Sequence, residues 1–268
     1  MNVLIKNIYY TIYNKYIMYE IVTVATHNEG KLDELIKNEL NIPVTVLGMG
    51  KKWTGFRMKY ELMYEHIQSM DDNKIIIFLD GFDSNIVGDP SNAIQKFQEK
   101  NAKLLFSKDL ENQGISLKMQ SKVFTPCKNN VILNSGMYMG YVKYLKPFYK
   151  YTLSQTCKDD QRNANKSCRH FDFISIDTEY EIFHNVSPFE RNKSNIEPNV
   201  IFVSYPGTIT IKRVYRSCLE LGQFFIYFLL LLYIILITLS VYKKCYTAIV
   251  LVTILFLLYF SRLDRSCM

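Results

Sequence analysis

Two aspartates follow a short apolar run in the first third of the chain. The run from Ile75 to Leu79 is apolar at consecutive rather than alternate positions, which is typical of a strand buried on both faces of a parallel sheet. Asp80 and Asp83 come just past its carboxyl end, where α/β sheets present their ligands. Two such carboxylates suit a hard divalent cation that bridges to phosphate, so they predict a nucleotide-diphosphate site. Asp-Gly-Phe-Asp is also ordinary turn chemistry, and a turn without a ligand stays open on these residues alone.

Two more polar groups interrupt apolar or structured segments further along the chain. Asn134, Ser135 and Gly136 lie within the strand-like run 130–141, where a glycine permits close approach of a ligand or of another backbone. A tight strand-to-helix turn is the alternative. Asp159 and Asp160 form a second carboxylate pair, which is either part of a site or a solvated charged loop.

The elements that must position these side chains alternate between strands and helices. Leu32, Leu35, Ile36 and Leu40 recur at helical spacing and predict a helix over 31–40, and Pro90 begins another. Besides the runs already described, short apolar or β-branched segments predict strands at 20–26, 44–47, 103–107, 173–176, 181–184 and 200–203. A strand, a helix and a second strand form a right-handed crossover. The expected fold class is therefore α/β, with a Rossmann-like, mainly parallel central sheet.

Composition limits the classes of function. The 268 residues allow one domain of about 200 residues and a further segment. The net charge of +7 is spread from Lys6 to Lys244 without an arginine-rich arm, so no nucleic-acid partner is expected. The six cysteines form no Cys-x-x-Cys pair and are expected to be reduced thiols, although Cys157 and Cys168 could bridge in an oxidising compartment.

The last fifth of the chain is far more apolar than the rest. Residues 221–242 contain no charged side chain, and 246–261 form a second apolar stretch after Lys243 and Lys244. These stretches predict a transmembrane hairpin, and with it a lipid bilayer as partner and an integral membrane protein anchored at its C-terminal end. The expected organisation is an N-terminal extension over 1–19, a globular domain over 20–216 and the hairpin over 221–261.

The opening residues make a poor signal peptide, so the globular domain is expected on the cytosolic side of the membrane. Three Asn-x-Ser triplets, at Asn165, Asn185 and Asn192, would instead favour the lumenal side.

Several blocks between Glu20 and Arg213 resemble, in order and spacing, the glycosyltransferase domain of the procollagen lysyl hydroxylases, the PLOD family. The blocks are EIVTVAT, VTVLGMGKKWTG, Lys59, KIIIFLDGFDSNIVGDP with KLLFS, VILNSGMYMGY and CKDDQ. The resemblance implies a GT-A fold that binds a UDP-sugar, with Mn²⁺ or another divalent cation held by an aspartate motif. It also implies transfer of glucose or galactose to hydroxylysine-linked acceptors in collagen.

The same resemblance implies roles for individual residues. Asp80 and Asp83 match the aspartates that hold the metal against the diphosphate. Asp159 and Asp160 match an acidic pair beside the donor sugar, where a carboxylate orients hydroxyls or accepts the proton of the attacking hydroxyl. The residues expected to contact the donor are Val24, Thr26, Trp53, Lys59, Asp80, Gly81, Phe82, Asn134, Ser135, Gly136 and Gly207.

One position departs from the family pattern. Where the family has His-Gly-Asn-Gly, this chain reads Ser204-Tyr205-Pro206-Gly207, so that Ser204 takes the place of a histidine metal ligand. A serine hydroxyl is a poor substitute for an imidazole on Mn²⁺. The expected function is a membrane-anchored transferase that moves a hexose from a UDP-sugar to a collagen-like or membrane-linked acceptor. The alternative is a degenerate form that keeps the fold for binding or scaffolding.

Overall fold

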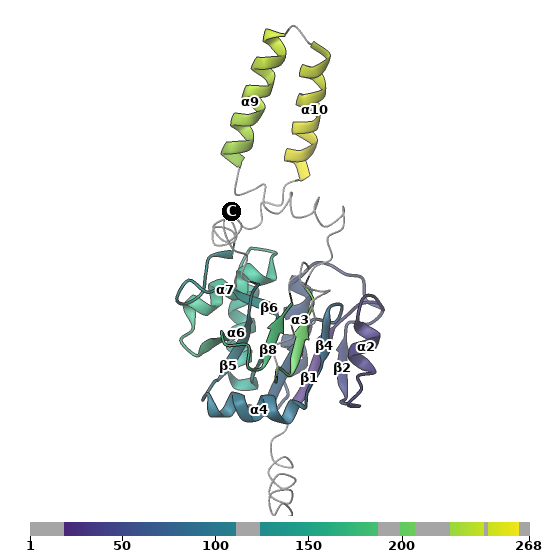
Figure 1. The fold of residues 1–268 in the computed structure, drawn as a ribbon, viewed down its shortest axis with the longest axis vertical. Helices are drawn as coiled ribbons and strands as arrows, with labels where there is room; N and C mark the ends of the chain where they lie inside the picture. Colours follow the sequence, from purple (N-terminus) through teal and green to yellow (C-terminus); the bar gives the residue numbers. More distant parts are fainter. Residues whose placement is uncertain (1–18, 111–123, 187–198, 207–225, 244–245, 263–268) are drawn as a thin grey trace, which may run out of the picture. The chain divides into compact units, whose positions relative to one another are not determined.

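The computed structural model describes residues 19–110, 124–186, 199–206, 226–243 and 246–262, and Figure 1 shows their arrangement. By its internal contacts the chain divides into two compact units, residues 1–207 and 208–268, which are described separately below. Nearly all of the predicted N-terminal extension lies outside the described residues.

A six-stranded sheet forms the centre of the first unit. Its strands, in spatial order, are β2 (Val44–Leu47), β1 (Tyr19–Val24), β3 (Ile75–Leu79), β6 (Leu133–Tyr141), β5 (Leu104–Lys108) and β7 (Ile174–Asp177). All neighbouring pairs are parallel except those of β6, which is antiparallel to both β3 and β5. The α/β class is confirmed, and the sheet is mixed. Because β6 runs the opposite way, its first residues lie at the edge where β3 and β5 end.

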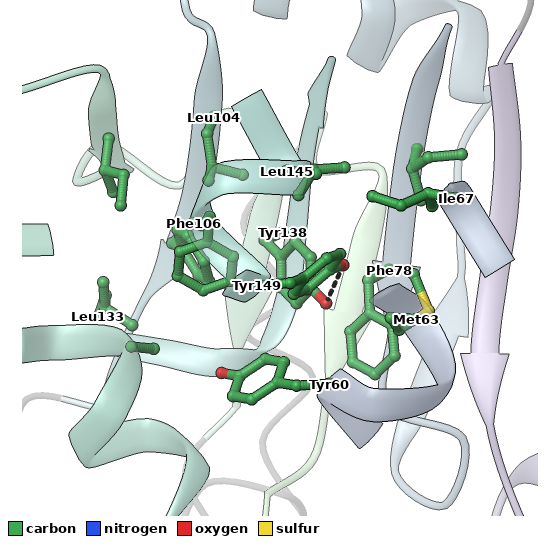
Figure 2. Close-up of a cluster of buried hydrophobic side chains, with 14 of the residues drawn as sticks. Tyr60, Met63, Ile67, Phe78, Leu104, Phe106, Leu133, Tyr138, Leu145 and Tyr149 are labelled. Atoms are coloured by element: carbon green, nitrogen blue, oxygen red, sulfur yellow. Dashed lines mark hydrogen bonds between the residues drawn. The ribbon is translucent and has the colours of Figure 1, made fainter. Parts of the chain in front are cut away.

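Strand β3 is buried on both faces, as its consecutive apolar residues predict. Ile76 and Phe78 belong to one hydrophobic cluster, whereas Ile75, Ile77 and Leu79 belong to another. The first cluster, part of which Figure 2 shows, is covered by α3 (Arg57–Ile67), α6 (Val142–Ser154) and α7 (Asp160–His170). The second is covered by α4 (Pro90–Glu99), which runs across the strands in Figure 1, and by a small sheet.

The small sheet consists of three short strands, β4 (Ser84–Ile86), β9 (Phe202–Ser204) and β8 (Phe183–Asn185). On the face that packs against the core, Ile86, Phe202 and Phe183 lie side by side in register. Two residues further along the strands, the same face carries the polar residues Ser84, Ser204 and Asn185. The apolar row anchors the small sheet, and the polar row brings β9 next to the turn that follows β3.

The first helix among the described residues, α2 (Leu32–Ile36), is shorter than its sequence predicts. Leu32 and Leu35 are buried, but Ile36 and Leu40 are 37% and 46% exposed, so the predicted apolar face does not extend to its end. The reason is Asn38. Its amide nitrogen donates to the carbonyls of Leu35 and Ile42, and its amide oxygen accepts from the Ile42 N–H. A side chain that supplies these bonds replaces the helical turn.

The described residues of the second unit form two packed helices, α9 (Ile226–Tyr242) and α10 (Tyr246–Arg262). The Tyr233 and Phe256 rings stack at 4.4 Å between centroids, and the Tyr233 hydroxyl lies 3.1 Å from the Thr253 hydroxyl. Within the described ranges, no helix combines the length and the apolarity that a membrane span needs. This finding overturns the predicted integral membrane location, and with it the cytosolic placement, and it leaves the predicted transmembrane hairpin without support. Residues 221–225 and 244–245 of that hairpin lie outside the described ranges.

A disulfide joins Cys127, just before β6, to Cys168 in α7, with their Cα atoms 5.5 Å apart. The sequence analysis expected reduced thiols and left open a bridge between Cys157 and Cys168. The expectation of a reduced thiol is wrong for Cys127 and Cys168, and Cys168 pairs with Cys127 instead of Cys157. The neighbouring Lys128 ammonium donates to the carbonyls of Phe171, Asp172 and Ile174 beyond the end of α7. Covalent and polar contacts thus fix the turn before β6 to the carboxyl end of α7.

Two of the three glycosylation triplets lie inside the fold. Asn165 is fully buried, and its side chain accepts from the Leu133 N–H and donates to the Leu133 carbonyl. Asn185 is 3% exposed and donates to the Lys108 carbonyl. Both side chains therefore serve the packing of the folded domain. Asn192 lies outside the described residues.

Replacing both Cys127 and Cys168 by serine should lower the free energy of unfolding by about 2–4 kcal/mol, because the disulfide restricts the unfolded chain across a separation of 41 residues. Urea unfolding under non-reducing conditions measures this. The double alanine variant is the matched control, since it places no hydroxyl in the core. An unfolding midpoint equal to that of the wild type in both variants would contradict the prediction.

Candidate functional site

The turn between β3 and β4 carries the first two candidate aspartates. Asp80 directly follows β3, and its N–H donates to the Gly136 carbonyl at 2.8 Å. The Ser84 N–H donates to the Asp80 carbonyl at 3.2 Å and closes the turn. Gly81 is required here, because a Cβ atom would lie 2.8 Å from the buried Thr23 hydroxyl. The segment is therefore a tight turn that also presents two carboxylates at the edge of the sheet.

Asp83 is held from the small sheet. The Ser204 hydroxyl donates to Asp83 Oδ1 at 3.1 Å, and the Tyr205 N–H donates to the Asp83 carbonyl at 2.8 Å. Antiparallel pairing of Ser84 with Ser204 explains this proximity, because Asp83 is the residue before β4. The structure thus brings together the two residues that the sequence assigned to one metal site, although they are 121 positions apart.

Lys59 lies at the centre of the site. Its side chain projects from α3 and is only 5% exposed. The ammonium lies 3.2 Å from Asp80 Oδ2 and 2.5 Å from Asp160 Oδ2. Burial acts to lower the pKa of Lys59, but the charges of Asp160 and then Asp80 outweigh it and raise the pKa above its usual value. Lys59 is therefore a fixed positive charge that joins the aspartate turn to the second acidic pair.

The two members of that second pair have different surroundings. Asp159 is the N-cap of α7, and its carboxylate accepts from the Arg162 N–H at 2.7 Å. Asp160 is buried, and its Oδ2 atom accepts from the Ser135 hydroxyl at 3.1 Å as well as from Lys59. The helix cap explains why Asp159 turns to its own backbone. Asp160 is the member that the fold connects to the other candidate residues.

The segment from Asn134 to Gly136 lies where the pairing of β5 with β6 is interrupted. Phe106 pairs with Tyr138, but the next residue, Ser107, pairs with Asn134. Asn134 uses its amide oxygen to accept from the Gly136 N–H at 2.7 Å. A Cβ atom on Gly136 would lie 2.9 Å from that oxygen and 3.6 Å from Asp80 Oδ2. A glycine thus allows the segment to lie against the aspartate turn.

The sequence analysis missed Asp109. Its two carboxylate oxygens accept from the Asn134 amide at 3.1 Å and from the Gln161 amide at 2.7 Å. Burial raises the pKa of Asp109 above its usual value, and the amide hydrogen bonds only partly offset this. Asp109 directly follows β5, just as Asp80 directly follows β3. The rule that singled out Asp80 could therefore have found it.

The residues expected near the nucleotide lie around the ends of β1 and β2. Val24 and Thr26 are 3% and 8% exposed, so these two residues offer little surface for contact. Trp53 is 39% exposed and meets the Phe56 ring edge-on at 5.9 Å, and Lys59 Nζ lies 5.5 Å from the Phe56 centroid. Phe82 is 5.3 Å from the ring of His27. Gly207 lies outside the described residues.

The donor atoms fit a hard divalent cation. Asp80, Asp83 and Asp160 together provide three carboxylates against one ammonium, Lys59, so the site has an excess of negative charge. Carboxylate and hydroxyl oxygens are the ligands that such cations prefer. In the part of the chain that the structure describes, no group of three or more histidine, cysteine or acidic residues is placed to hold a metal. Any cation bound here would thus depend on Asp80 and Asp83, with Ser204 in a weak third position.

Comparison with known proteins gives one family and several relatives. The family model of the PLOD GT domain matches residues 16–197. The chain is 26% identical over 219 residues to mouse procollagen-lysine,2-oxoglutarate 5-dioxygenase 2, which covers 70% of this chain and 29% of that protein. It is 27% identical over 158 residues to the multifunctional procollagen lysine hydroxylase and glycosyltransferase of Caenorhabditis elegans, covering 53% and 21%. The chain spans less than a third of the length of these relatives.

The structure predicts that the two adjacent aspartates differ in their effect on stability. Asp160→Asn should lower the free energy of unfolding by about 1–3 kcal/mol, because it leaves the buried Lys59 ammonium with one carboxylate instead of two. Asp159→Asn is the matched control and should change it by less than about 0.5 kcal/mol, because asparagine is an equally good N-cap. Urea unfolding at neutral pH measures both. Equal losses for the two variants would contradict the assignment.

Proposed function

The chain belongs to the PLOD GT domain family, and on this basis we propose that it is a glycosyltransferase that moves a hexose, glucose or galactose, from a UDP-sugar to a hydroxyl acceptor. One observation supports the proposal most directly. Lys59 contacts both Asp80, in the turn expected at the diphosphate, and Asp160, in the pair expected at the donor sugar. A nucleotide-sugar requires these two functions next to each other.

Asp80 and Asp83 are the residues that would hold a divalent cation, Mn²⁺ by resemblance to the family. When bound, such an ion supplies Lewis-acid chemistry, offsetting the negative charge of the departing diphosphate. The hydroxyl of Ser204 keeps the Asp83 carboxylate oriented from β9. Without a cation the excess of carboxylates would repel a diphosphate, so the proposed donor needs one.

Asp160 is the proposed residue for the hexose. The Lys59 ammonium and the Ser135 hydroxyl both contact Oδ2 of Asp160, and Oδ1 is proposed to accept a hydrogen bond from a sugar hydroxyl or from the attacking hydroxyl. Asn134 and Asp109 extend the same row of polar groups toward β5. Val24, Thr26, Trp53, Gly81, Phe82 and Gly136 are proposed to border the nucleotide, and Asp159 supports the site as the cap of α7.

The acceptor is proposed from the relatives. Their names describe procollagen lysine hydroxylases and glycosyltransferases, so a hydroxylysine or galactosyl-hydroxylysine of a collagen-like protein is the proposed acceptor. The second candidate function is a degenerate binding or scaffolding form. It is favoured by Ser204, whose hydroxyl donates to Asp83 at the position where the family has a histidine.

Incubation of the purified protein with UDP-glucose or UDP-galactose and Mn²⁺ should release UDP, and Asp83→Ala should lower the rate at least about 100-fold, because it removes one of two carboxylates for the cation. Asp33→Ala, the same change on the exposed helix α2, is the matched control and should leave the rate unchanged. Absence of UDP release from the wild type, together with absence of UDP binding in calorimetry, would favour the scaffold.

Ser204→His should lower the Mn²⁺ concentration needed for half-maximal UDP release, by about tenfold, because an imidazole binds Mn²⁺ better than a hydroxyl does. Titration of Mn²⁺ at saturating donor measures this. Ser204→Ala separates the loss of the hydroxyl bond to Asp83 from the gain of a ligand. An unchanged Mn²⁺ requirement in an active Ser204→His enzyme would contradict the placement of residue 204 at the metal.

A further inference from the structure

We propose that Tyr60 is a positioning residue for Asp160, which it holds through the backbone while Lys59 holds the side chain. The inference rests on the proposed function, in which Asp160 faces the hexose. Tyr60 and Lys59 are consecutive residues of α3. The Tyr60 hydroxyl donates to the Asp160 carbonyl at 3.2 Å, across 100 positions of sequence. Two neighbouring side chains of one helix thus fix two different atoms of one residue in another helix.

The ring of Tyr60 is itself held rigidly. The side chain is 2% exposed, its ring meets Phe148 edge-on at 5.7 Å, and the Tyr149 ring lies 5.8 Å away. These contacts come from α6, which packs directly beside α3. Because these neighbours already restrict the ring, little further side-chain entropy is lost when its hydroxyl bonds to a partner.

The hydroxyl of Tyr60 is directed to Asp160 and not to the other tyrosines of the cluster. Tyr138 and Tyr149 share a hydrogen bond of 2.7 Å between their hydroxyls. In Figure 2 the dashed line joins that pair, and the Tyr60 oxygen lies at the far end of its own ring, away from them. Burial, and next the negative charge of Asp160, raise the pKa of Tyr60 well above its usual value. The phenol therefore stays a hydrogen-bond donor throughout the physiological pH range.

The hydrogen bond to the Asp160 carbonyl fixes the position of the first turn of α7. Asp160 is the first residue of α7, so its backbone position determines where the carboxylate enters the site. From that position Oδ2 meets both the Lys59 ammonium and the Ser135 hydroxyl. A shift of the first turn of α7 would weaken both contacts together. Tyr60 is therefore expected to act on catalysis through Asp160, without touching the substrate.

The chain provides a matched pair of variants for the test. Tyr60→Phe and Tyr149→Phe each remove one buried phenol oxygen and keep the ring, so their losses of stability should be similar. Only Tyr60→Phe removes a bond to Asp160. We expect Tyr60→Phe to lower kcat for UDP release about fivefold with little change in KM for the donor. Tyr149→Phe should leave kcat within about twofold of the wild type. Equal effects of the two variants on kcat would overturn the proposal.

A second measurement does not depend on turnover. In protein labelled with ¹⁵N-lysine, the resonance of the buried Lys59 ammonium, identified by its loss in Lys59→Met, reports the contact with Asp160. Tyr60→Phe should speed the exchange of its protons with water, and Tyr149→Phe should not. Unchanged exchange in Tyr60→Phe would overturn the proposal. Absence of turnover in a wild type that shows the expected exchange would count against the transferase and leave the positioning role supported.

A third measurement keeps the hydroxyl and so does not rely on a variant that lacks it. Fluorotyrosine placed at position 60 should show a ¹⁹F resonance that shifts more on Asp160→Asn than on Asp159→Asn, because its hydroxyl bonds to residue 160 and not to residue 159. Equal shifts for the two variants would show that residue 60 senses the end of α7 in general, and would overturn the specific link to Asp160.

Discussion

The ion pairs of one buried lysine connect the two acidic segments of the candidate site. The Lys59 ammonium is nearly inaccessible to water and lies between a carboxylate from the main sheet and another from α7. A buried charge lowers the stability of the fold unless it is paired. The folded state is therefore most stable while Asp80 and Asp160 contact the Lys59 ammonium. The ammonium offsets part of the mutual repulsion of the carboxylates and leaves a net negative charge.

The antiparallel strand β6 gives this site its composition. In a purely parallel sheet, only residues after the ends of strands would meet at the edge. Because β6 runs the other way, its opening residues Asn134 to Gly136 lie between the residues that follow β3 and β5. Hydrogen bonds from the edge then connect Asp80, Asn134 and Asp109 in a continuous row. One reversed strand thus adds amide and hydroxyl groups to an edge that carboxylates alone would otherwise occupy.

The sequence alone was sufficient to predict features that depend on residues close together in the chain. Consecutive apolar residues identified β3, and an aspartate directly after it marked the edge of the sheet. The sequence alone was insufficient where contacts between distant segments determine the role of a residue. Family resemblance placed Ser204 with Asp83, but only the pairing of β4 with β9 explains physically why the two meet. Only the N-cap of α7 separates the role of Asp159 from that of Asp160.

The sequence patterns were misleading for two segments, helix α7 and the apolar C-terminal stretches. Helix α7 buries Asn163, Asn165 and Ser167, so it lacks the apolar periodicity by which helices are recognised, and it resembled a charged loop. The C-terminal stretches are strongly apolar, but apolarity in sequence does not determine where a helix begins and ends. Among the described residues, no helix there combines the length and the apolarity that a membrane span needs, so the predicted integral membrane location was wrong.

The disulfide between Cys127 and Cys168 has a topological consequence. The loop that it closes contains both Asn134 to Gly136 and the pair Asp159 and Asp160, together with all of α6. Cleavage of the backbone anywhere inside this loop would leave the two fragments covalently attached through sulfur. The half of the site from β6 and the half from α7 therefore remain tethered to each other even in a nicked chain, and they separate only when the bond is reduced.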